Sequence, residues 1–240
     1  MYDQPEYSFS VYSQNILNTL QTTLQYIYYK NEQTNKLAAS SIYGGCYAQP
    51  LITAATIDNR PIRFNTDTSF YYNENTVGAG FTLPLNLSGG KQYRFLTFTS
   101  TYNINHLKLI GVGKRFFKDK NFNYFQNRIF FSSQVQKATQ QIFPRWSQVV
   151  TLQYRNVVNN NNAIQFLASG SFYFPGLMQN HHLVLTAAYS ARDTMNLYQF
   201  SDNFPFSRGY RLINFPRMYN VGANYHFPLC YPDIGFGNIV

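Results

Sequence analysis

Apolar and polar residues alternate along several segments of this chain, and these segments are unusually long. In residues 77–87 the odd positions are all apolar, and the even positions are glycine, proline or polar. The segments 164–174 and 219–229 also have eleven residues, and each carries one apolar face. A period of two places successive side chains on opposite faces of a β-strand. Soluble strands typically have about five or six residues, and tilted membrane-spanning strands about 9–11. The pattern therefore predicts long strands with one apolar face.

The composition restricts the class of protein further. Only 12% of the 240 residues are charged, while Phe and Tyr number 22 and 21. Disordered chains are poor in aromatic residues, and soluble enzymes need far more surface charge. A helical membrane protein is excluded because the longest nearly apolar run, 183–191, is well short of the roughly 18 residues that a spanning helix needs. The mean hydropathy of −0.31 fits strands that are apolar on one face only.

Ten strands are predicted, and the connections between them differ in length. The predicted strands are residues 7–13, 19–30, 36–48, 76–88, 91–104, 122–136, 147–157, 163–174, 181–191 and 217–229. The long connections 49–75, 105–121 and 192–216 all fall at one end, which is typical of a bacterial barrel with external loops. We therefore expect an antiparallel, up-and-down transmembrane β-barrel in the bacterial outer membrane, with residues 1–240 as one domain. A soluble all-β sandwich is the alternative.

The most specific local motif lies in the long connection 192–216. Arg208, Gly209 and Tyr210 are followed by a strand that ends in Tyr-His-Phe-Pro-Leu at 225–229. This arrangement resembles the C-terminal barrel of the bacterial surface-antigen and outer-membrane assembly-factor superfamily. The resemblance implies a barrel of about sixteen strands whose external loop folds into the lumen, where the arginine meets polar groups.

The resemblance also bears on how much of a barrel the chain contains. It implies about four further strands after 217–229, whereas residues 234–240 contain only the start of one. The N-terminus has neither the basic nor the apolar region of an export signal. We therefore expect the chain to be truncated at both ends. The alternation places Asn220, Asn224 and His226 on the polar face, as possible partners of Arg208 in the lumen.

Catalytic, cofactor and metal sites find little support in the sequence. On the predicted strands, no strand carries two of the ten carboxylates, and the chain has no Gly-x-Ser-x-Gly motif. His181 and His182 are adjacent, so in a strand they point to opposite faces and cannot chelate one ion together. Cys46 and Cys230 form no metal or redox motif, and we expect free thiols, although a disulfide between them remains open. No enzymatic activity and no cofactor are predicted.

The net charge of +9 bears on the partners. The basic residues form no run, and the densest cluster, within 114–120, belongs to a predicted connection, so binding to nucleic acid is not expected. The expected partners are outer-membrane lipid and lipopolysaccharide. The resemblance adds an unfolded polypeptide or a periplasmic domain of the same chain, and it implies a membrane anchor or a conduit for polypeptide insertion or translocation. The alternatives are a porin-like solute channel, a glycan-binding barrel that uses Tyr71, Tyr72 and Asn73, and an outer-membrane hydrolase.

Overall fold

The computed structural model consists almost entirely of β-strands. It describes residues 6–17, 19–30, 33–63, 69–116, 118–137, 141–159, 163–178, 180–193, 200, 204–206 and 215–228. The strands are β1 (Glu6–Gln14), β2 (Leu20–Tyr29), β3 (Thr34–Tyr43), β4 (Gln49–Arg63), β5 (Ser69–Asn86), β6 (Gln92–Ile110), β7 (Lys120–Val135), β8 (Ser147–Val157), β9 (Ile164–Pro175), β10 (His182–Arg192) and β11 (Arg217–His226). One short helix, α1 (Gly113–Phe116), follows β6.

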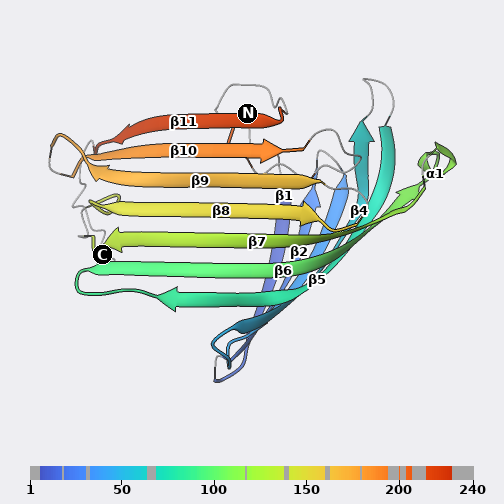
Figure 1. Ribbon diagram of the computed structural model, residues 1–240, viewed down its shortest axis with the longest axis horizontal. Helices are drawn as coiled ribbons and strands as arrows, with labels where there is room; N and C mark the ends of the chain where they lie inside the picture. The colour runs from blue at the N-terminus through green and yellow to red at the C-terminus, as the bar shows by residue number, and fades with distance from the viewer. Residues whose placement is uncertain are drawn as a thin grey trace, which may run out of the picture.

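Each strand pairs antiparallel with the next strand in the sequence, so the eleven strands form one up-and-down sheet in the order β1 to β11. The predicted all-β, antiparallel, up-and-down topology is confirmed. The sheet is strongly curled, so that its N-terminal strands, drawn in blue, pass behind the middle strands β6–β8 in Figure 1. It is not closed, because β1 and β11 are its two edges in the part of the chain that the structure describes. No described helix has the length and hydrophobicity needed to cross a membrane.

The predicted number of ten strands is wrong, because the region 49–75 is not a loop. It contains β4 and the first part of β5, which pair with each other on either side of residues 64–68. The register shifts between Ile57 and Arg60, where Asn59 has a φ of 60°. A bulge of this kind interrupts the period-two pattern by which a strand is recognised. The alternation therefore missed one whole strand.

The central strands are also longer than predicted. β5, β6 and β7 have 18, 19 and 16 residues, and β6 continues to Ile110 through a region predicted as a loop. Two of the three long connections predicted at one end are therefore short: residues 64–68 link β4 to β5, and residues 111–119 link β6 to β7. Only the third, residues 193–216 between β10 and β11, is long. Most residues of the two predicted loops 49–75 and 105–121 therefore belong to strands, whose outer ends are polar.

Candidate functional site

The register confirms that one face of the sheet is apolar. Directly opposed residues of an antiparallel pair lie on the same face, so the pairs Ile52–Ala79 and Ala79–Tyr102 align the apolar positions of three strands. The large exposed hydrophobic side chains of this apolar face include Phe9, Leu24, Leu37, Ile52, Val77, Phe81, Ile104, Phe125, Ile129, Tyr154, Leu185, Tyr219 and Val221. Among the described residues of β1–β10, this face carries no charged side chain between the row Leu85–Leu96 and the row Val77–Ile104. On β11 it carries Arg217, opposite Ala191 and in the row of Phe81 and Ser100.

The apolar face ends abruptly one row beyond Val77 and Ile104. There the hydroxyl of Thr56 donates to Oδ1 of Asn75 over 2.7 Å. His106 pairs with Asn121 in the same row. These side chains point to the same side as the apolar residues, so the change from apolar to polar follows a line across β4–β7. The polar extensions of the long strands begin at this line.

The opposite face is polar and more buried. Thr101, Asn103 and Asn105 of β6 are 7%, 6% and 1% exposed, although all three are polar. Nδ2 of Asn103 donates to the hydroxyl of Thr101 over 3.0 Å, so part of this polarity is satisfied within the strand. A curled sheet crowds the side chains on its concave face and separates those on its convex face. The polar face is therefore the inner, concave one.

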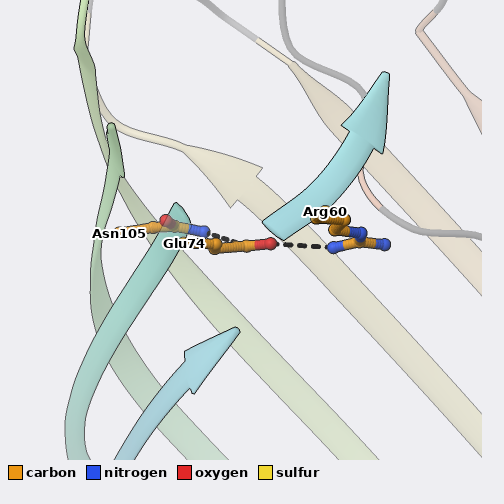
Figure 2. Close-up of polar contacts among 3 residues, drawn as sticks. All are labelled: Arg60, Glu74 and Asn105. Carbon is orange, nitrogen blue, oxygen red and sulfur yellow. Dashed lines mark hydrogen bonds and ion pairs between the residues drawn. The ribbon is translucent and has the colours of Figure 1, made fainter. Parts of the chain in front are cut away.

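An ion pair joins two strands on the polar face. Nη1 of Arg60, just beyond the bulge in β4, lies 2.7 Å from Oε2 of Glu74 in β5. Nδ2 of Asn105 donates to the other carboxylate oxygen over 2.6 Å. Figure 2 shows Glu74 between its two partners. The bulge is what turns Arg60 to this face, opposite Tyr72. This cluster fastens the extensions of β4, β5 and β6 to one another.

Three further arginines lie on the polar face of β7, β8 and β10. Arg155 shares a row with Gln126 and Gln165, and Gln165 in turn pairs with Arg192. Nε of Arg155 donates to Oε1 of Gln126 over 3.0 Å, and Nη1 donates to Oε1 of Gln165 over 3.4 Å. Arg128 lies one row away, opposite Gln153. We call Arg128, Arg155 and Arg192 the arginine row.

The described parts of the connection 193–216 pack against this polar face. Phe200 is 6% exposed and forms a cluster with Phe122, Val157 and Ala163. Its ring contacts that of Tyr124 edge-on, with centroids 5.2 Å apart. The guanidinium of Arg155 lies 5.7 Å from the centre of the same ring. Phe200 therefore packs against Arg155, the middle member of the arginine row.

A second contact holds the connection further along. Phe204 packs with Leu167, Ala188 and Met218 of β9, β10 and β11. Next to it, the side-chain amide of Asn220 donates to the carbonyl of Pro205. A hollow of about 280 Å³ remains beside Pro205, lined mainly by the small side chains of Thr151, Ser169, Ser171, Thr186 and Ala188. Phe200 and Phe204 thus contact the polar face at two places, and a hollow remains beside Pro205.

The structure brings together only some of the predicted site residues. Arg208, Gly209 and Tyr210 lie outside the described residues, so their predicted contacts stay predictions. Asn220 contacts the connection, as described above, and Asn224 is an exposed position of β11.

His226 lies opposite His182 at the other end of the polar face. Its ring contacts Phe143, with centroids 5.1 Å apart. His182 is 1% exposed and faces the same phenylalanine. His181 pairs instead with the hydroxyl of Tyr225 over 2.8 Å, which confirms that the two adjacent histidines lie on opposite faces.

The other predicted groups stay apart from these contacts. Tyr71 and Tyr72 are consecutive residues of β5, so they point to opposite faces and do not form one stacking platform. Cys46 is exposed and free, and Cys230 lies outside the described residues. The described residues contain no group of three or more His, Cys, Asp or Glu arranged to hold a metal ion.

Sequence reasoning missed Arg60, Glu74 and the arginine row. Arg60 and Glu74 belong to a predicted loop, and a usable signal was the polar run 65–69, whose composition is typical of a hairpin turn. The arginine row had no such signal, because its members belong to strands that are far apart in the sequence. Comparisons with protein-family models, curated proteins and solved structures found no match to this chain.

Proposed function

We propose that this chain forms part of the wall of a bacterial outer-membrane β-barrel, with its apolar face towards lipid and its polar face towards the lumen. The observation that carries the proposal is the apolar band aligned across the strands, which is uncharged on β1–β10. Residues 77–87 extend about 34 Å at about 3.4 Å per residue. A tilt of about 40° reduces this to about 26 Å, close to the roughly 25 Å apolar band of such barrels.

The burial pattern favours this arrangement over a soluble sandwich. A sandwich buries its apolar side chains between two sheets and exposes the polar ones. Here Val77 is 57% exposed, whereas Asn103 and Asn105 on the other face are buried. Soluble proteins rarely expose apolar patches of more than a few hundred Å². In lipid, the edges β1 and β11 must also be paired, either with each other or with further strands.

We further propose that the barrel serves as a membrane anchor or as a conduit for polypeptide insertion or translocation. The packing of Phe200 and Phe204 on the polar face supports an interior that is partly occupied by residues 193–216. An open porin leaves this space to water. A porin-like channel is the second candidate, because the hollow beside Pro205 is lined by hydroxyl groups.

The barrel is tested by comparing two adjacent positions of β10. In a chain whose Cys46 and Cys230 are replaced by serine, Leu185→Cys places a thiol on the apolar face and Thr186→Cys places one on the polar face. After refolding into vesicles, we expect a water-soluble maleimide to label position 186 and to spare position 185. Unfolded samples serve as the control, because both positions then react. Equal labelling in vesicles, or no heat-dependent change in gel mobility, contradicts the barrel.

The conduit is tested separately from the barrel. A photoreactive side chain at Asn224, which is exposed on the polar face of β11, is expected to crosslink to an unfolded polypeptide presented to the refolded protein. The same group at Tyr219, on the apolar face, is the matched control. Crosslinking that is absent at Asn224, or equal at both positions, leaves the role of membrane anchor and removes that of conduit.

A further inference from the structure

The polar face carries an excess of positive charge. On the described strands its cationic side chains are Lys36, Arg60, Lys120, Arg128, Arg155 and Arg192, and its carboxylates are Glu6 and Glu74. Glu74 is paired with Arg60, and Glu6 lies at one end of the edge strand β1. The strand residues of this face therefore carry a net positive charge.

Most of the positive charge away from that ion pair belongs to the arginine row. Arg155 and Arg192 lie in one row on β8 and β10, with only β9 between them. At about 4.8 Å between neighbouring strands, their backbones are about 10 Å apart. Arg128 lies on β7, beside β8, and is diagonally adjacent to Arg155. Three guanidinium groups thus cross the polar face within four neighbouring strands.

Glutamine side chains separate these arginines. Gln126 and Gln165 accept hydrogen bonds from Arg155 through their amide oxygens. Gln165 is 4% exposed and also lies opposite Arg192. An amide oxygen satisfies a guanidinium donor and adds no net negative charge. The glutamines therefore orient the guanidinium of Arg155 without adding negative charge beside it.

We propose that the arginine row binds small oxyanions and makes the interior of the barrel selective for anions. This inference rests on the proposed function and names its solute class. The planar fork of a guanidinium matches the oxygens of a phosphate or carboxylate group. Rings of arginine and lysine side chains give anion selectivity to pores in the same way. The hollow lined by hydroxyl groups begins one row from Arg128 and provides space on the same face.

The selectivity is tested in planar lipid bilayers under a gradient of potassium chloride. We expect the reversal potential of the full chain to have the sign of anion selectivity. Arg128→Gln and Arg155→Gln are expected to lower the ratio of anion to cation permeability severalfold. Lys118→Gln removes the same charge from a connection outside the polar face and is the matched control. Cation selectivity in the unmodified chain, or the same ratio in all three variants, overturns the proposal.

A second measurement keeps the proposal testable in a barrel that conducts poorly. In detergent, inorganic phosphate is expected to raise the unfolding temperature more than chloride at equal ionic strength. Removing one bidentate, charge-assisted contact with Arg155→Gln is expected to weaken phosphate binding at least about tenfold. Arg155→Lys keeps the charge and loses the planar fork. Its affinity for phosphate is expected to lie between those of the unmodified chain and Arg155→Gln. No phosphate effect, or an equal effect in Arg155→Gln, overturns the proposal.

The two measurements also separate this proposal from the proposed barrel. If gel mobility does not depend on heating and cysteine labelling does not alternate, the barrel fails. The phosphate titration in detergent still reports on the arginine row in that case. If the barrel passes those tests and phosphate has no effect, only the anion site fails.

Discussion

Replacing Ile129 by lysine is the sharpest test of which solvent covers the apolar face. Ile129 lies near the middle of the apolar positions of β7, opposite Phe98 and Leu152. It is 39% exposed, so its side chain lies at the surface of the sheet and not in a closed core. If that surface met water, the substitution would cost no more than about 0.5 kcal/mol, as surface changes usually do.

In a bilayer the cost is much larger. A lysine near the midplane of a transmembrane barrel destabilises it by about 2–4 kcal/mol. Since about 1.4 kcal/mol corresponds to a factor of ten, the folding equilibrium constant is expected to fall between about 30-fold and about 700-fold. Thr151→Lys is the matched control, because Thr151 belongs to the neighbouring strand β8, lies on the polar face and borders the hollow. We expect Thr151→Lys to change stability by less than about 1 kcal/mol.

The assay is reversible unfolding in guanidinium chloride of the full chain refolded into phospholipid vesicles, followed by the fluorescence of its single tryptophan. The expected result is a large loss for Ile129→Lys and a small one for Thr151→Lys. Equal losses would refute the assignment of the two faces. A loss for Ile129→Lys below about 0.5 kcal/mol would refute contact with lipid, because that is the cost expected at a water-exposed surface.

Three further substitutions test the packing of the polar face. Phe200→Ala is expected to destabilise the docking of its connection by about 3–5 kcal/mol and to speed its proteolysis, whereas the exposed Phe215→Ala is not. Gly78→Ala places a methyl group against the side chains of the two neighbouring strands and is expected to cost about 1–3 kcal/mol in unfolding experiments, while Gly89→Ala meets open space and costs little. Glu74→Gln is expected to lower the free energy of unfolding by about 1 kcal/mol, and no loss would contradict a stabilising ion pair.

The sequence predicted strands best where the alternation is uninterrupted. The predicted strands 163–174 and 181–191 lie within one residue of β9 and β10 at each end. β4 was missed because the bulge before Arg60 shifts the pattern by one position. A further reason is that β4 and β5 both extend beyond the apolar band. In these outer parts neither face has to be apolar, so the sequence does not alternate.

The predicted site depended on the connection 192–216, and here the sequence predicted less. It identified a long segment and three polar positions of the last strand, of which Asn220 contacts that segment. The anchoring roles of Phe200 and Phe204 were not predicted. A phenylalanine in a polar connection shows no periodicity, so nothing local reveals which surface it will cover.

The sequence by itself determined the two faces of the sheet, because alternation is a property of the local backbone and needs no knowledge of the partner strand. Tertiary structure decided which polar residues meet. Arg60, Glu74 and Asn105 come from three strands, as do Arg128, Arg155 and Arg192, and only the register brings each group together. Register is set by the pairing of whole strands and by the turns between them. The positive charge of the inner face is therefore a consequence of assembly.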